Sequence, residues 1–203
     1  MIAGIVLAAG RSRRMGRPKP LLGFRGESFL GTAVAALRGG GCGEVLVVAA
    51  PPDDPAAAAV AAEAERAGAR VVTNPRPDSE QVDSLRAGLA ALPPGALAAV
   101  VLPADVPGVD AAAVGAVVAA FRARGAPVVR AVHAGEHGHP VLFARRVFAD
   151  LFRDPLPEGA RSVVHAHAAG LEEVEVDSPD VLLDVDTPDD YRRLLEEHGG
   201  GPG

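Results

Sequence analysis

The chain has 203 residues, of which 48% are hydrophobic and 23% are charged, and its net charge is −6. This length suits one domain with a full core, so we expect residues 1–198 to form it and residues 199–203 to be a flexible tail. The acidic balance argues against a nucleic-acid-binding protein, which would carry a basic surface. The single cysteine, Cys42, cannot form an internal disulfide, which favours a reducing, cytoplasmic compartment. No apolar run approaches the roughly 20 residues of a membrane helix.

Short aliphatic runs alternate with helical patterns along the chain. Strands are expected at residues 2–7, 45–49, 71–72, 98–102, 128–132 and 141–143, and helices at 29–37, 53–68, 80–92 and 110–124. Helical patterns follow at 145–152, 160–168 and 187–198, with extended runs at 174–176 and 181–185. The loop 133–140 is too short for a helical crossover, so its flanking strands are expected to pair antiparallel. The order predicts a three-layer α/β fold: a mostly parallel sheet, helices on both faces and a short antiparallel element.

The loop after the first strand carries the strongest functional signal. Small residues at Ala8, Ala9 and Gly10 let a ligand approach the backbone, and five cationic side chains follow between Arg11 and Lys19. On an acidic chain this density favours a polyphosphate ligand over a basic surface loop. The loop matches neither the Walker A nor the dinucleotide-binding motif. Lys19 is the one lysine among 20 basic residues, which indicates either a role that a guanidinium cannot fill or chance.

Two aspartates follow aliphatic runs. Asp105 lies between Pro103 and Pro107, and Asp186 precedes a helix start. Carboxylates at the carboxyl ends of strands face the ligand crevice of such folds, and Mg²⁺ prefers one or two of them together with phosphate oxygens. We therefore expect Asp105 and Asp186 to bind the metal, with helix capping as the rival role near Asp186. Asp184 is a weaker candidate, because strand alternation would put it one pleat behind Asp186.

Two histidines, His137 and His139, flank Gly138 in the predicted 133–140 loop. A zinc site is not expected, because no cysteine or third fixed ligand is evident nearby. The loop is expected either to face an anionic acceptor or to be an exposed hairpin turn. His165 and His167 are predicted to lie on the surface.

Residues 7–22 contain the pattern Leu-Ala-Ala-Gly-x-Ser-x-Arg-Met-Gly-x-x-Lys-x-Leu-Leu. It resembles the signature loop of the MobA-like nucleotidyltransferases, and among them most closely that of the molybdenum cofactor cytidylyltransferases (MocA type). The resemblance implies a Rossmann-like nucleotidyltransferase fold, and its Ala-Ala-Gly form implies CTP rather than GTP. The nucleotide-binding residues that the resemblance implies are Leu7, Ala8, Ala9, Gly10, Arg14, Lys19, Asn74, Ser84 and Gly88.

Four further segments resemble the family in order along the chain. Asn74 with residues 84–88 is similar to the segment that holds base and ribose, and residues 103–107 and 184–188 are similar to its metal-binding loops. Residues 138–143 resemble its acceptor-side segment, which implies Gly138, His139 and Pro140 as acceptor-binding residues. Residues 75–83 depart from the family: Pro77 stands where Trp is common, and Glu80 and Asp83 add carboxylates near the expected triphosphate.

The expected activity is therefore Mg²⁺-dependent transfer of CMP from CTP to the phosphate of a molybdopterin-type cofactor, with Mn²⁺ as an alternative metal. Catalysis would come from positioning and charge, with Lys19, Arg14 and Asp105 as the catalytic residues. A molybdoenzyme or its chaperone is a conceivable partner, whereas nucleic acid and membrane are not expected. The alternatives are a GTP-using guanylyltransferase, a sugar- or alcohol-phosphate nucleotidyltransferase, and a non-catalytic cofactor carrier that the altered 77–83 segment would favour.

Overall fold

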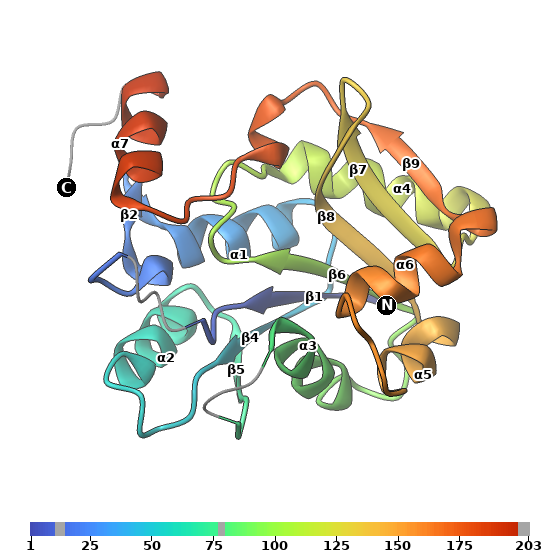
Figure 1. The fold of residues 1–203 in the computed structure, drawn as a ribbon, viewed down its shortest axis with the longest axis horizontal. Helices are drawn as coiled ribbons and strands as arrows, with labels where there is room; N and C mark the ends of the chain where they lie inside the picture. The colour runs from blue at the N-terminus through green and yellow to red at the C-terminus, as the bar shows by residue number, and fades with distance from the viewer. Residues whose placement is uncertain (11–14, 77–79, 199–203) are drawn as a thin grey trace.

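The computed structural model of the chain describes residues 1–10, 15–76 and 80–198. Its centre is a seven-stranded sheet in the order β5-β4-β1-β6-β8-β7-β9 (Figure 1). The strands are β1 (Ile2–Leu7), β4 (Glu44–Ala49), β5 (Arg70–Thr73), β6 (Ala98–Pro103), β7 (Val128–His133), β8 (Glu136–Ala144) and β9 (Glu172–Glu175). Only β8 runs against its neighbours in this sheet, and β2 (Gly23–Phe24) pairs antiparallel with β3 (Glu27–Ser28). The predicted mostly parallel α/β fold with an antiparallel element is confirmed.

The sheet is buried on both faces, as the aliphatic β1 predicts. Ile2 and Val6 belong to the core on one face, whereas Ala3 and Ile5 belong to the core on the other. The first face is covered by α1 (Phe29–Gly39), α2 (Ala57–Arg66) and α4 (Ala111–Arg124). The second face is covered by α3 (Gln81–Ala90), α5 (Phe148–Leu151) and α6 (Ala160–Ala166). Two cores therefore fix the sheet, and its carboxyl edge stays available for loops that carry polar residues.

Helix ends follow the polar and glycine residues that the sequence places there. Asp110 accepts a hydrogen bond from the Ala113 amide at the start of α4, and Gly125 ends that helix in the left-handed conformation, with φ of 61°. Thr187 and Asp190 form a reciprocal capping box at the start of α7 (Pro188–Glu197). The capping expected near Asp186 is therefore provided by Thr187.

The last helix, α7, packs beside β2 and β3 rather than on the main sheet (Figure 1). Its Tyr191 meets the ring of Phe29 edge to face, and the Tyr191 hydroxyl donates to the Gly23 carbonyl at 2.8 Å. Leu194 and Leu195 complete this third apolar cluster. The C-terminal segment is thereby anchored next to the segment that follows the first loop.

Several predicted elements have different bounds in the structure. The run 181–185 is not extended throughout, because residues Pro179–Leu182 form a 3₁₀ turn, η4, that Ser178 caps. The helix expected at 53–68 begins only at Ala57, since Asp54 closes a turn on the Ala56 amide instead. The segment 145–152 divides into a 3₁₀ turn, η2 (Arg145–Val147), and α5, and a further 3₁₀ turn, η3 (Ala168–Gly170), follows α6. No helix in the described ranges is both long and apolar enough to cross a membrane.

The loop expected at 133–140 is mostly strand. β7 and β8 pair antiparallel, as predicted, but their turn is confined to Ala134 and Gly135, with φ of 50° and 81°. Positive φ at both central residues is the geometry of a two-residue hairpin turn. Gly138, His139 and Pro140 consequently lie within β8 and not in a loop.

Gly88 brings α3 close to the sheet, because a Cβ atom on it would lie 2.9 Å from Cγ2 of Ile5 and 3.0 Å from Cγ2 of Val48. We expect Gly88→Val to lower the free energy of unfolding by about 1–3 kcal/mol through overpacking. Urea unfolding measures this change. Ala90→Val is the matched control, because Ala90 is exposed on the same helix and its replacement should cost only a few tenths of a kcal/mol. Equal losses in both variants would contradict the packing role of Gly88.

Candidate active site

Three chain segments meet at the carboxyl edge of the sheet. Backbone hydrogen bonds tie them together: the Ala8 amide donates to the Val48 carbonyl at 2.9 Å, and the Ala104 amide donates to the Leu7 carbonyl at 3.0 Å. The Val185 amide donates to the Asp105 carbonyl at 2.9 Å. These bonds bring the first loop, the end of β6 and the segment before α7 to one place.

Lys19 lies between the two predicted metal ligands. Its Nζ donates to Oδ2 of Asp105 at 3.2 Å and to Oδ1 of Asp186 at 2.6 Å, across sequence separations of 86 and 167 residues. Only 14% of the Lys19 side chain is exposed. Burial lowers the pKa of this ammonium, but the hydrogen bonds and charges of Asp186 and Asp105 outweigh burial and raise the pKa above its usual value. Lys19 therefore carries a firmly positive charge at the junction of the three segments.

The two carboxylates also fit a divalent cation. Both direct an oxygen at one cationic atom, so the pair converges on a shared point, and carboxylate oxygens are the ligands that Mg²⁺ and Mn²⁺ favour. Among the described residues, no three His, Cys, Asp or Glu side chains gather as a metal-binding set. The remaining ligands of a metal here would be water and substrate phosphate oxygens, as is usual for Mg²⁺.

Asp184 lies close enough to Lys19, Asp105 and Asp186 to interact with their charges. The strand that was expected to place it behind Asp186 is not present at residues 181–185. Burial raises the pKa of its carboxyl, and the negative charges of Asp105 and Asp186 raise it further, whereas the charge of Lys19 lowers it. An excess of negative charge thus surrounds the Lys19 ammonium, and a second cation would relieve it.

A small cavity of about 70 Å³ opens between the first loop and Asp105. It is lined by Leu7, Ala8, Gly10, Lys19, Pro20, Ala104 and Asp105. Among the described residues, a Cβ atom on Gly10 would meet nothing within 4 Å, as the glycine predicts. Of the other cations expected in the loop, Arg17 is exposed, whereas Arg11, Arg13 and Arg14 lie outside the described residues.

Asn74 and Ser84, which were expected to hold the base and ribose, lie side by side and are hydrogen-bonded to each other. Asn74 and Ser84 are both buried, and Nδ2 of Asn74 donates to Oγ of Ser84 at 2.9 Å. Oδ1 of Asn74 accepts from the Arg76 amide at 3.0 Å, which shapes the chain leading toward α3. Gly88 serves helix–sheet packing in the structure. Contact of these three residues with a nucleotide stays a prediction.

The carboxylate of Asp83 does not act as a free negative charge. It pairs with Arg76 at 3.2 Å and with Arg86 at 3.3 Å, and its side chain is mostly buried. This pairing reduces the repulsion that Asp83 would exert on a triphosphate. Glu80 is exposed and lines a second cavity, whereas Pro77 lies outside the described residues.

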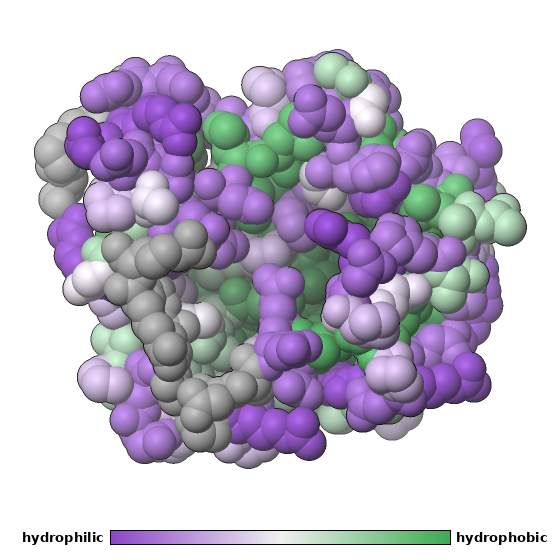
Figure 2. Space-filling view, viewed as in Figure 1, coloured by the Kyte–Doolittle hydropathy of each residue, from purple (hydrophilic) through white to green (hydrophobic). Residues whose placement is uncertain are grey.

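This second cavity, of about 590 Å³, adjoins the first one, since Leu7 lines both. Figure 2 shows this face of the molecule hollowed, with hydrophobic residues inside the hollow and hydrophilic residues around it. The predicted acceptor residues Gly138 and His139 line the cavity, and Pro140 follows them in β8. A Cβ atom on Gly138 would lie 2.7 Å from the Val181 carbonyl oxygen, so only glycine lets β8 approach η4 this closely.

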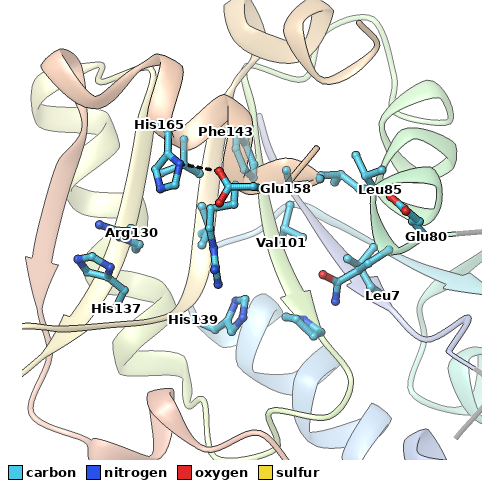
Figure 3. A pocket seen from close by; sticks show the side chains of 18 of the residues that line it. Leu7, Glu80, Leu85, Val101, Arg130, His137, His139, Phe143, Glu158 and His165 are labelled. Atoms are coloured by element: carbon cyan, nitrogen blue, oxygen red, sulfur yellow. Dashed lines mark hydrogen bonds and ion pairs between the residues drawn. The ribbon is translucent and has the colours of Figure 1, made fainter. Parts of the chain in front are cut away.

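Several charged or titratable residues that line this cavity carry no predicted site role. Besides Glu80 and His137, Figure 3 shows Arg130, Glu158 and His165, and Arg161 lines the cavity as well. His165 is exposed, as predicted for the surface, and its Nδ1 lies 3.0 Å from Oε2 of Glu158. None of these last four residues follows a strand end or belongs to a spacing that indicates a site. In the sequence, Glu158, Arg161 and His165 are polar residues in or beside a short helical pattern, and Arg130 lies within a predicted strand.

The imidazole of His139 is the most strongly perturbed group that lines the cavity. Burial lowers its pKa to about 4, the Arg161 charge lowers it as well, and the Asp105 charge opposes them. The unfolded chain therefore binds more protons between about pH 4 and pH 6.5, so this histidine makes stability fall as the pH drops through that window.

We expect wild-type protein to lose about 2 kcal/mol more unfolding free energy than His139→Gln between pH 7 and pH 5. Urea titrations at the two pH values measure the difference. His165→Gln removes an exposed histidine and should keep the wild-type pH dependence. If His139→Gln lost as much stability as wild-type protein, the buried neutral imidazole would not be the cause.

Comparisons with known proteins agree with this geometry. The chain matches the model of the MobA-like NTP transferase domain over residues 4–197. No curated protein meets the criterion for a match. Among solved structures, Rv0371c from Mycobacterium tuberculosis H37Rv is 36% identical with a TM-score of 0.83, and the alignment covers 96% of this chain and 97% of that one.

Two further structures are similar over nearly their full lengths. The Rv0371c homolog from Mycobacterium sp. strain JC1 is 34% identical with a TM-score of 0.81, covering 97% of this chain and 96% of that one. A manganese complex of Rv0371c is 35% identical with a TM-score of 0.78, covering 96% and 98%. The predicted family is therefore confirmed: this chain belongs to the family of the MobA-like NTP transferase domain.

Proposed function

We propose that the chain transfers the CMP unit of CTP to the phosphate of a molybdopterin-type cofactor and releases pyrophosphate. The observation that carries the proposal is the convergence of Lys19, Asp105 and Asp186 beside the small-residue loop at Ala8–Gly10. One ammonium and two carboxylates at an open backbone loop suit a metal-bound triphosphate. The Ala-Ala-Gly form of the loop, through its resemblance to the cytidylyltransferases, supports CTP as the donor.

Mg²⁺ is the proposed metal, and Mn²⁺ is proposed to replace it. The donor set of Asp105 and Asp186 suits either ion, and a manganese complex of the similar Rv0371c supports the second. When bound, the ion would neutralise charge on the reacting phosphates. Asp105 and Asp186 would hold it through the oxygens that now face Lys19.

In the proposed reaction, an oxygen of the acceptor phosphate attacks the α-phosphorus of CTP. A new P–O bond forms, the bond between the α-phosphorus and its bridging oxygen breaks, and pyrophosphate leaves with that electron pair. The acceptor phosphate is already ionised near neutral pH, so no strong general base is required. Lys19 would stabilise the charge that develops on the phosphates, and Arg14 is proposed to bind the leaving pyrophosphate.

Nucleotide binding should stabilise the protein selectively. With Mg²⁺ and CTP at about 100 times its dissociation constant, we expect about 2.7 kcal/mol of added stability, whereas GTP, ATP and UTP should add little at that concentration. Thermal unfolding with each nucleotide measures this. A shift with GTP alone would move the assignment to guanylyl transfer, and the absence of any shift would favour the carrier.

Removal of one metal ligand should abolish metal-dependent turnover. We expect Asp105→Ala and the isosteric Asp105→Asn to lower the rate of CMP transfer to molybdopterin by at least about 100-fold, because a bound metal contributes several kcal/mol to such a transition state. Pyrophosphate release measures the rate, and unfolding temperatures without ligands check the fold. Asp53→Ala is the control, since Asp53 is an exposed aspartate that lines neither cavity. Undiminished turnover in Asp105→Asn would remove Asp105 from the mechanism.

A further inference from the structure

The larger cavity has the size and lining of a small-molecule site. Its volume of about 590 Å³ lies within the usual range of roughly 300–1,000 Å³ for sites that enclose compact ligands. Its apolar lining includes Leu85 of α3, Val101 of β6 and Phe143 of β8, which Figure 3 shows on one side of the hollow. A ligand with a compact apolar or ring-shaped body would fit against this lining.

One end of the cavity reaches the catalytic centre. Leu7 lines both cavities, and Pro103, which precedes the Asp105 turn, lines the larger one. His139 interacts electrostatically both with Asp105 on one side and with Arg161 on the other. His139 is therefore close enough to both the Asp105 carboxylate and the Arg161 guanidinium to interact with their charges.

Cationic groups at this end have unused hydrogen-bonding capacity. Within the described part of the chain, the Arg161 side chain has no hydrogen bond or ion pair, unlike Arg130, which pairs with Glu173. Among the same residues, Nδ1 of His139 is buried without a hydrogen-bond partner, and so is Nε of Arg130. Figure 3 shows the His139 and Arg130 side chains facing the cavity. Buried nitrogens without partners are costly unless a ligand or water completes them.

The negative groups around the cavity are placed differently. Glu158 is committed to His165 at 3.0 Å, and Glu80 is exposed at the α3 side. Asp105 belongs to the centre and pairs with Lys19 at 3.2 Å. An anionic ligand group is therefore best accommodated at Arg161 and His139.

We propose that Arg161 and Nδ1 of His139 bind the phosphate of the acceptor, and that the acceptor is a phosphate monoester with a compact apolar or ring-shaped body. This inference rests on the proposed function and assigns Arg161 as the residue that selects the acceptor. A guanidinium grips a phosphate through two parallel hydrogen bonds, and the imidazole tautomer protonated at Nδ1 donates a third. The phosphate is thereby held between the apolar lining and the metal-binding carboxylates.

The test uses 1-naphthyl phosphate as the probe and 1-naphthol as its uncharged counterpart, each titrated calorimetrically into the full chain. We expect wild-type protein to bind the phosphate ester about 10- to 100-fold more tightly than the alcohol, the range of a charge-assisted phosphate contact. Arg161→Ala should remove this preference, and Arg161→Lys should retain part of it, because lysine keeps the charge but not the paired donors.

Arg153→Ala is the matched control, because Arg153 is an exposed arginine between α5 and α6 that does not line the cavity. It should keep the wild-type preference. Unfolding temperatures should match for all variants, since the Arg161 side chain is exposed.

Equal affinities of wild-type and Arg161→Ala protein for the phosphate ester would overturn the inference, as would a wild-type chain that does not prefer the ester. Displacement of the probe by CTP would also overturn it, because the cavity would then belong to the nucleotide. Thermal shifts with Mg²⁺ and CTP on the same samples distinguish a failure of this inference from a failure of the proposed function. A retained nucleotide shift without ester binding rejects the inference alone, whereas loss of both rejects the proposed function as well.

Discussion

The Lys19 ammonium lies between two carboxylates that are 86 and 167 residues further along the chain. Asp105 and Asp186 each direct an oxygen at it, at 3.2 Å and 2.6 Å, and the Lys19 side chain itself is mostly buried. Two carboxylates held this close repel each other unless a cation lies between them, and Asp184 adds to the negative charge. The site is therefore built around a cation. Lysine fills that position here, and the same oxygens suit a divalent ion bound with substrate.

The convergence depends on backbone and capping interactions some distance from the charges. Asp105 is fixed because β6 lies beside β1 in the sheet and the Val185 amide bonds to the Asp105 carbonyl. Asp186 is fixed because Thr187 and Asp190 cap the helix directly after it, and α7 is anchored through Tyr191. Hydrogen bonds from Thr187 and Arg193 hold the pKa of the Asp190 carboxyl at about 2, so the cap stays ionised at any ordinary pH. The position of the Asp186 carboxylate thus depends on the cap at Thr187 and on the anchoring of α7 at Tyr191.

What could be predicted from the sequence depended on how local the signal was. Asp105 follows β6, and parallel strands bring their carboxyl ends to one edge of the sheet. Asp186 was expected there for the same reason, but it follows a segment that is not a strand, and the bond from the Val185 amide to the Asp105 carbonyl places it beside Asp105. The turn at Ala134 and Gly135 is narrower than the predicted loop, since nothing in residues 133–140 marks where the pairing of the two strands stops. Arg161 was missed for a different reason. It lies in a short helix whose pattern indicates only burial, and its position opposite His139 exists only once α6 packs on the sheet. Tertiary proximity of that kind has no local sequence signature.

The two adjoining cavities divide the chemistry between separate parts of the chain. The small cavity is formed by the first loop and the Asp105 turn, and the large one by β8, α3 and the start of α6, where apolar side chains lie beside histidines and charged residues. Leu7 separates them, and His139 faces the larger one while its charge environment reaches Asp105. Substitutions in the large cavity can therefore change its lining without altering the carboxylates proposed to hold the metal.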